Sequence, residues 1–165
     1  MSELVVNKER CVGCCSCEIA CAVEHSLTRR VFGAVSESSP PRKRIFVTAA
    51  GGRCLPLNCR HCEDALCVQA CPVGAFYRDK DEGLVLHAEE LCLGCGLCQM
   101  ACPFGVISRR AGSKVIVKCD RCPGLSVPAC VNACPTGALV YGEAPILENL
   151  KRQELAGKLL GLGSL

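Results

Sequence analysis

Residues 59–72 read CRHCEDALCVQACP, and residues 92–103 read CLGCGLCQMACP. The second stretch spaces its cysteines as C-x2-C-x2-C-x3-C followed by proline, and the first repeats this order with two extra residues before its third cysteine. In this bacterial spacing, three thiolates hold one 4Fe-4S cluster and the fourth reaches a second cluster. Each stretch is therefore incomplete alone, and the two together predict one two-cluster unit.

The two stretches complete each other by exchanging their fourth cysteine. The predicted ligand sets are Cys59, Cys62 and Cys67 with Cys102, and Cys92, Cys95 and Cys98 with Cys71. This exchange predicts two clusters that lie close enough to pass electrons to one another.

Two further cysteine groups flank this pair. They are Cys11, Cys14, Cys17 and Cys21, and Cys119, Cys122, Cys130 and Cys134. Once the central pair is closed, nested pairing assigns Cys11, Cys14 and Cys17 with Cys134, and Cys119, Cys122 and Cys130 with Cys21. Sixteen of the eighteen cysteines are then ligands of four 4Fe-4S clusters.

Cys15 and Cys54 are surplus to this pattern. Together with Cys59 and Cys62, Cys54 also spells the plant-type spacing C-x4-C-x2-C, but that interpretation leaves the neighbouring cysteines without a use. We expect Cys15 and Cys54 to be free thiols, and a redox-sensing role for them is the alternative.

Composition indicates that clusters fill the interior. The 165 residues include eighteen cysteines but only four Phe, two Tyr and no Trp, so an ordinary aliphatic and aromatic core is hard to assemble. A secreted disulfide framework is the competing explanation, but the N-terminus lacks a basic region followed by an apolar segment. We therefore expect a soluble cytoplasmic protein, with no direct membrane span because no apolar segment is long enough.

The formal charge of +3 does not indicate nucleic-acid binding. Four oxidised clusters with their sixteen thiolates add about −8, which brings the loaded protein to about −5. A basic stripe with interleaved aromatic residues, as base stacking requires, is absent. Residues 42–44, Arg-Lys-Arg, form either a solvated turn or a docking surface for an acidic redox partner.

The fold class predicted from these patterns is α+β, with two nested bacterial-ferredoxin-like units, short strands, short helices and many cluster-binding loops. The expected domains are residues 53–110 as the central unit, residues 1–52 together with 111–143 as the outer unit, and residues 144–165 as a C-terminal helical tail. An internal repeat supports this organisation, because PVGA, PFGV and PTGA follow Cys71, Cys102 and Cys134.

Local patterns predict the individual elements. Strands are expected at residues 3–6, 45–48, 84–86, 115–117 and 139–141, and a turn at residues 78–83. Ala22 replaces the proline that follows the fourth cysteine elsewhere, so a longer helix is expected over residues 19–27. The leucines of residues 146–160 predict a helix that packs back on the body.

The predicted sites favour electron transfer over catalysis. Zinc would need two separated cysteine pairs, whereas these runs carry four cysteines each. Complete cysteine sets leave no vacant position for His25, His61 or His87 and no iron open to substrate. We therefore expect no catalytic residues and no enzyme activity in this chain, with catalysis in partner subunits.

The chain resembles the four-cluster iron-sulfur subunits of the DMSO reductase and formate dehydrogenase beta-subunit family. The resemblance rests on the four cysteine groups and on residues 59–62, 118–122, 128–130 and 134–138. It implies the same nested ligand sets and a relay of four clusters between a catalytic subunit and a second partner. The spacer between Cys122 and Cys130 is shorter than in larger members, which removes a loop that could serve in docking.

Residues 21–26 and 41–47 look like the electron-transfer ferredoxin associated with nickel carbon monoxide dehydrogenase. That resemblance implies that carbon monoxide dehydrogenase is the electron donor, and that a hydrogenase or a flavin NAD(P) oxidoreductase is the acceptor. The alternative is the iron-sulfur subunit of a tungsten or molybdenum aldehyde or formate oxidoreductase.

Overall fold

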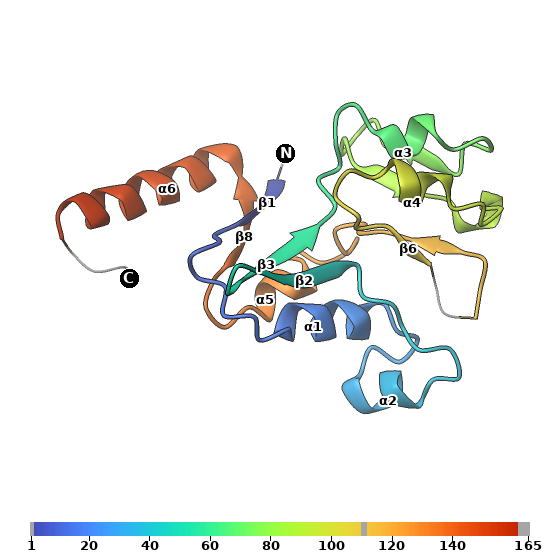
Figure 1. The fold of residues 1–165 in the computed structure, drawn as a ribbon, viewed down its shortest axis with the longest axis horizontal. Coiled ribbons are helices and arrows are strands. Elements are labelled where there is room, and N and C mark those ends of the chain that lie inside the picture. The colour runs from blue at the N-terminus through green and yellow to red at the C-terminus, as the bar shows by residue number, and fades with distance from the viewer. Residues whose placement is uncertain (1, 110–111, 162–165) are drawn as a thin grey trace.

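Short helices and short hairpins make up the fold, in agreement with the predicted α+β class. The computed structural model describes residues 2–109 and 112–161 (Figure 1). Within these residues the strands pair into four antiparallel sheets of two strands each. Such small sheets bury little area, so the interior depends on the loops and helices between them.

The first and last strands pair, which brings the N-terminal segment beside the segment that precedes the C-terminal helix. β1 (Ser2–Val6) runs antiparallel to β8 (Leu139–Glu143), and both strands were predicted from sequence. Beside them, α1 (Ser16–Glu24) packs against α5 (Ala129–Asn132). The buried residues of this part include Leu4, Cys17, Cys21, Ile45, Cys130 and Leu139. Thiols therefore stand where an ordinary core has aliphatic side chains.

A second buried cluster lies between α3 (Leu66–Gln69) and α4 (Leu97–Ala101), which pack against each other. β4 (Phe76–Arg78) and β5 (Val85–His87) form the predicted hairpin beside α3, and a 3-10 helix spans Glu89–Leu91. The buried residues here are Ala65, Phe76, Val85, Cys98, Ile107 and Ile116. The two buried clusters lie in different parts of the body and share no residue.

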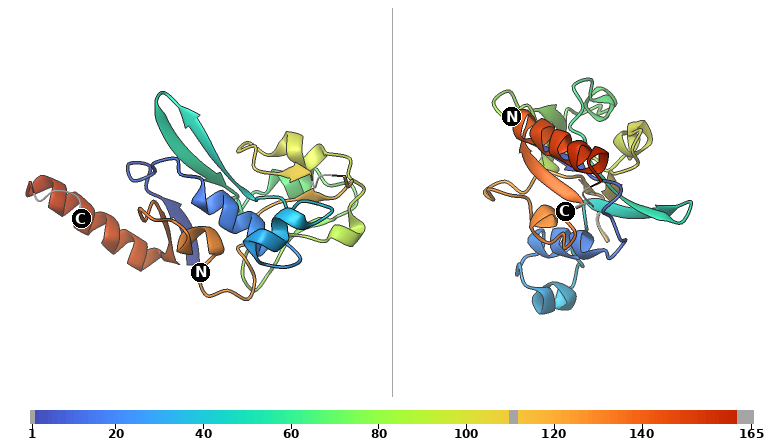
Figure 2. Two further views of the ribbon diagram at one scale, coloured as in Figure 1. Left: turned by 90° about the horizontal axis from the view of Figure 1, so that it is seen from below. Right: turned by 90° about the vertical axis from the view of Figure 1, so that its left-hand side faces the viewer.

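Two further hairpins connect these parts. β2 (Ile45–Ala50) and β3 (Arg53–Asn58) are joined at Gly51 and Gly52, whose φ angles of 55° and 74° suit glycine. This hairpin projects from the body (Figure 2). The strand at 45–48 is confirmed, whereas β3 was not predicted because it contains Pro56. Only a strand at the edge of a sheet tolerates proline in this way. β6 (Ser108–Arg109) pairs with the predicted β7 (Ile116–Val117).

The region after the first cysteine group differs from its prediction. α1 ends at Glu24 instead of residue 27, although its nine residues make it longer than α3, α4 and α5, as the absence of proline suggested. A second helix, α2 (Val31–Ser36), follows in a stretch for which the sequence analysis predicts no helix or strand. Ala34 is its buried residue, while the Phe32 and Val35 side chains are exposed. The sequence of α2 has no amphipathic pattern that predicts a helix, because its apolar side chains mostly face solvent.

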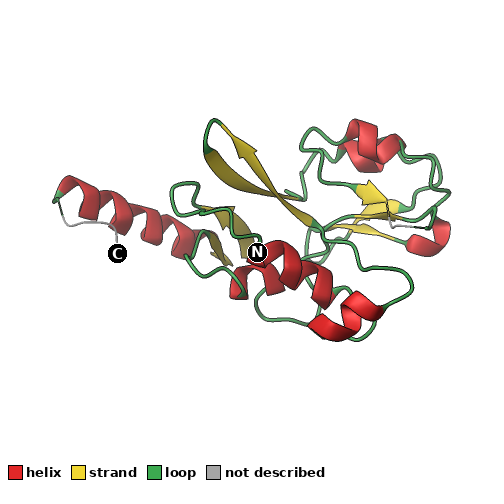
Figure 3. Ribbon diagram, turned by 60° about the horizontal axis from the view of Figure 1, so that its bottom comes forward, coloured by secondary structure: helices red, strands yellow, loops and turns green. Residues whose placement is uncertain are grey.

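The C-terminal helix is confirmed, and it packs against β8 and β1 as predicted, although several of its leucines stay exposed. α6 (Ala144–Leu159) extends away from the body (Figures 1 and 3). Leu147 is buried, whereas Leu155 and Leu159 are exposed. A polar contact also ties α6 to the body: Asn7 Nδ2 donates to Glu154 Oε1 at 3.0 Å. No helix of the described residues has the length and apolar character needed to cross a membrane.

Replacing Phe76 with alanine is expected to lower the free energy of unfolding by about 3–5 kcal/mol, because its side chain is 2% exposed and stacks on the His87 ring at 4.5 Å. Anaerobic denaturant titration of the loaded protein measures the change. Phe32→Ala is the matched control, since Phe32 is 90% exposed and its loss should stay within about 0.5 kcal/mol. Equal losses for both variants would contradict the assignment of Phe76 to the core.

Candidate iron-sulfur sites

The cysteines of the first group divide between two locations. Cys11, Cys14 and Cys17 line one hollow together with the surplus Cys15 and with Cys134, which arrives from the loop after α5. Cys21 lies one turn farther along α1 than Cys17 and is close to Cys119, Cys122 and Cys130. Burial, together with Cys119 and Cys122, raises the pKa of the Cys21 thiol to about 12. Helix α1 thus presents thiols to two separate sites.

The central cysteines divide in the same manner. Cys67 lies near Cys59 and Cys102, and burial followed by these neighbours raises its pKa. Burial, with contributions from Cys92 and Cys95, raises the pKa of Cys98 to about 11. Buried thiols of this kind resist ionisation in the empty protein, so the positive charge of bound iron is what would favour their thiolates.

The repeated tetrapeptide after the fourth cysteine builds an amide-lined loop. Gly74, Gly105 and Gly137 occupy the same place in the three copies and have φ angles of 64°, 62° and 63°. The backbone N–H groups of residues 73–76 point at Cys71 and lower the pKa of its thiol against the effect of burial. The equivalent loop acts on Cys134 in the same direction. These loops supply hydrogen bonds that a cluster-bound thiolate requires.

The four C-x2-C turns share one backbone geometry that the sequence did not reveal. The residue before the second cysteine has a positive φ in every group, at Gly13, His61, Gly94 and Arg121. Glycine adopts this conformation easily, whereas His61 and Arg121 need anchors. His61 Nδ1 accepts the Val85 N–H at 3.1 Å, and Arg121 Nη1 donates to the Ser2 carbonyl. The four C-x2-C turns therefore share this positive φ, although the spacing to the third cysteine differs between the groups.

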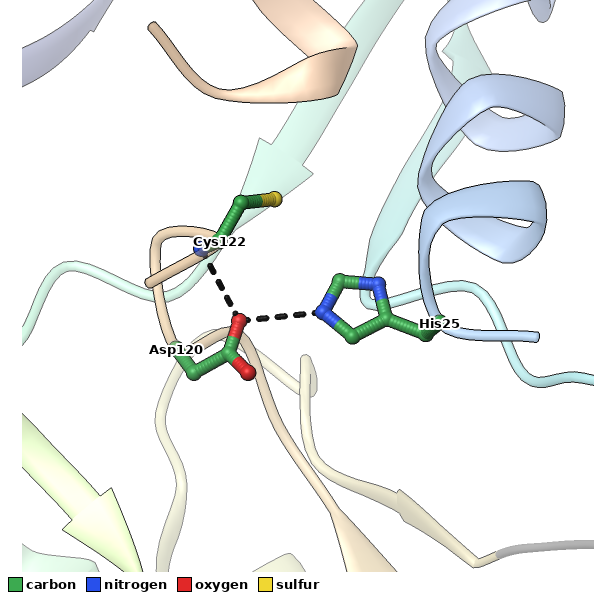
Figure 4. A group of neighbouring side chains, drawn as sticks. All are labelled: His25, Asp120 and Cys122. Atoms are coloured by element: carbon green, nitrogen blue, oxygen red, sulfur yellow. Dashed lines mark hydrogen bonds and ion pairs between the residues drawn. The ribbon is translucent and has the colours of Figure 1, made fainter. Parts of the chain in front are cut away.

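A charged network joins α1 to the fourth cysteine group (Figure 4). Asp120 Oδ1 lies 3.0 Å from His25 Nε2 and accepts the Cys122 N–H at 3.0 Å, while Asp120 Oδ2 lies 2.5 Å from Arg44 Nη1. Burial raises the pKa of Asp120, but the His25 hydrogen bond and the Arg44 charge outweigh it and hold that pKa well below its usual range. The Arg44 backbone N–H also donates to Cys21 Sγ at 3.2 Å.

His25, Asp120 and Cys122 bring potential metal-binding atoms within 4.8 Å of one another. Both Asp120 oxygens, however, already accept hydrogen bonds from within the chain. The network therefore holds the Cys119–Cys122 turn against α1. His61 is 7% exposed and accepts a hydrogen bond from the chain, so it is an interior residue.

The basic residues 42–44 do not form a free docking surface. Lys43 Nζ lies 2.6 Å from Glu18 Oε2, and Arg42 Nε donates to the Arg109 carbonyl at 2.9 Å. With Arg44 paired to Asp120, all three side chains contact distant parts of the chain. The charges of Lys43 and Arg44 are therefore paired with carboxylates of the chain, whereas Arg42 stays exposed with a carbonyl as its partner.

The surplus cysteines lie beside the first cysteine group. A Cβ atom placed on Gly13 would be 2.6 Å from Cys54 Sγ, so Cys54 packs directly against the turn between Cys11 and Cys14. Cys15 is half-buried, has a φ of 60° and precedes the first turn of α1. No disulfide joins any of the eighteen cysteines, all of which lie within the described residues.

Groups of thiols in apolar surroundings, with amide-lined loops around them, define a scaffold for iron-sulfur clusters. The donors present fit such clusters, because thiolate is their usual ligand. Comparison with known proteins agrees. The profile of the 4Fe-4S dicluster domain matches residues 52–144, and the chain belongs to this family of iron-sulfur proteins.

Curated relatives span most of the chain. An iron-sulfur protein of Rhodospirillum rubrum is 41% identical over 82% of this chain and 79% of its own length. The electron transport protein HydN of Escherichia coli K12 is 35% identical over 92% of this chain and 93% of its own length. The B subunit of anaerobic dimethyl sulfoxide reductase from the same strain is 33% identical over 89% of this chain and 75% of its own length.

Replacing Asp120 with asparagine is expected to lower the free energy of unfolding by about 1–3 kcal/mol, because Arg44 and His25 lose a charged acceptor in a site where the Arg44 side chain is only 14% exposed. Anaerobic thermal unfolding measures the change. Arg152→Gln is the control, since Arg152 and Glu148 form an exposed pair whose loss should cost no more than about 0.5 kcal/mol. Equal effects would show that the Asp120 network contributes no special stability.

Proposed function

We propose that this chain is an electron-transfer protein that carries four 4Fe-4S clusters, each held by four cysteine thiolates. The ligand sets pair three cysteines of one group with the fourth of another: Cys11, Cys14, Cys17 and Cys134; Cys21, Cys119, Cys122 and Cys130; Cys59, Cys62, Cys67 and Cys102; and Cys71, Cys92, Cys95 and Cys98.

The observation that carries this proposal is the division of α1 between two sites. Cys17 lies in the hollow with Cys134, while Cys21 lies with Cys119 and Cys122. The proximity of Cys67 to Cys102 supports the same exchange in the central pair. The nested organisation follows, with residues 53–110 as the central unit, residues 1–52 with 111–143 as the outer unit, and residues 144–165 as the tail. Pairing of β1 with β8 supports it.

Contacts between the sets suggest the order of a linear relay. Cys17 lies within electrostatic reach of Cys130, which links the two outer sets. Cys119 is near Cys59, and Cys98 is near Cys67. If each cluster is named by the first cysteine of its three-cysteine group, the order along the relay is Cys11, Cys119, Cys59 and Cys92. The Cys11 and Cys92 clusters are then at the two ends.

Full thiolate ligation leaves no iron for substrate, so the chain serves a catalytic partner and is not itself an enzyme. We propose a cytoplasmic complex in which carbon monoxide dehydrogenase supplies electrons and a hydrogenase or flavin NAD(P) oxidoreductase accepts them. The second candidate is an iron-sulfur subunit of a molybdenum or tungsten oxidoreductase. The similarity to the B subunit of anaerobic dimethyl sulfoxide reductase favours this candidate.

Alanine substitutions test the ligand sets by counting iron in anaerobically reconstituted protein. The unaltered chain should hold about sixteen irons, and Cys134→Ala about twelve. The double variant Cys11→Ala with Cys134→Ala should lose no more than Cys134→Ala alone, because both residues serve one cluster. Cys130→Ala with Cys134→Ala should lose about eight irons, because they serve two.

Cys15→Ala and Cys54→Ala are the matched controls and should retain all the iron. A loss of about four irons from Cys54→Ala would contradict the proposed sets. So would a loss of only about four from the double variant of Cys130 and Cys134.

The metal content of the native complex, isolated anaerobically, distinguishes the partners. Nickel, with about sixteen irons contributed by each copy of this chain, is expected if carbon monoxide dehydrogenase is the catalytic subunit. Molybdenum or tungsten without nickel would exclude that partner and support the second candidate.

A further inference from the structure

Lys118 is a buried cation at the junction between the two proposed units. The residue is 3% exposed, and its Nζ donates to the Cys119 carbonyl at 2.6 Å and to the Val85 carbonyl. Val85 belongs to the β4–β5 hairpin, whereas Cys119 follows β7. The side chain therefore connects backbone from both units in the interior of the protein.

Within residues 2–109 and 112–161, no ion pair places a carboxylate beside the Lys118 ammonium. A buried charge without a partner of opposite sign is costly, even when carbonyl groups accept its hydrogen bonds. Glu89 and Asp120 line a pocket together with Lys118, and the neighbouring thiols are a further source of negative charge. Cys67 on one side and Cys119 on the other both lie within electrostatic reach of Lys118.

These two cysteines belong to different proposed ligand sets. A 4Fe-4S cluster with four thiolates has a net charge of about −2 when oxidised and about −3 after one electron is added. A fixed positive charge attracts the reduced form more strongly than the oxidised form. Cys59 is also near Cys119, so the clusters held by these two cysteines face each other across the junction. The attraction of Lys118 for the reduced form therefore acts on both clusters.

We propose that the positive charge of Lys118 raises the reduction potentials of two clusters above the values that they would have without this charge. These junction clusters are the one held by Cys59 and Cys67 and the one held by Cys119. This inference rests on the proposed function. Reduction adds one electron to a cluster from a low-potential donor, and no bond forms or breaks. The electron is thereby stabilised where it must cross between the units, and the clusters at the ends of the relay are less affected because they are farther from Lys118.

Potentiometric titration of the loaded protein with dithionite and redox mediators, followed by EPR, tests the proposal. Lys118→Gln keeps a hydrogen-bond donor but removes the charge, and Lys118→Arg keeps the charge. We expect Lys118→Gln to disfavour reduction of two clusters by at least tenfold, which is about 59 mV for a one-electron couple. Lys118→Arg should leave these potentials within a small fraction of that change.

Lys80→Gln is the matched control, because Lys80 is an exposed lysine in the turn of the same β4–β5 hairpin and its substitution changes the net charge equally. Unchanged potentials in a fully loaded Lys118→Gln variant, or an equal shift in Lys80→Gln, would overturn the proposal. If Lys118→Gln fails to retain iron, Lys118→Arg decides: full loading with unaltered potentials supports the role of the charge, and a tenfold shift despite the retained charge refutes it.

The iron content of the unaltered protein separates this inference from the proposed function. Fewer than about sixteen irons would contradict the four-cluster proposal. A full iron content with potentials that do not respond to Lys118 would contradict only the inference about this residue.

Discussion

The interior of this protein depends on helix contacts that bring together thiols from distant parts of the chain. α1 packs against α5, and α3 packs against α4. Cys17, Cys21 and Cys130 are among the buried residues of the first contact, and Cys98 is buried in the second. With four Phe, two Tyr and two-stranded sheets, the chain has few other means of filling its interior. Metal-ligand bonds that cross between segments would then supply much of the folding free energy.

The local structure is repetitive even where the sequence is not. A positive φ recurs before the second cysteine of all four groups, although two of these residues are His61 and Arg121 instead of glycine. Each has its own anchor in a remote strand, which offsets the cost of the backbone conformation. The requirement that two thiols of a C-x2-C turn converge on one cluster explains why the geometry persists when glycine does not.

Charged side chains connect the cysteine-bearing segments. Arg44 and Lys43 hold the beginning of β2 against Asp120 and Glu18, and Lys118 lies inside the junction. Exposed apolar side chains lie on α2 and along α6, and also within the cysteine groups, as at Val12 and Leu93. Lys43, Arg44 and Lys118 therefore have structural roles around the proposed clusters, in accord with the negative charge that clusters would bring.

Sequence alone was sufficient for the iron-sulfur assignment, the α+β class, the strands predicted at residues 3–6 and 139–141, and the C-terminal helix. Those features depend on cysteine spacing and on short-range propensity, and both can be recognised from residues that are close together in the sequence. The tertiary structure decided that α6 extends from the body, that α2 exists with its apolar side chains exposed, and that residues 42–44 are paired internally. These outcomes depend on partners tens of residues away, such as Asp120 for Arg44. Local patterns carry no information about which distant carboxylate or carbonyl a folded chain will bring within hydrogen-bond distance.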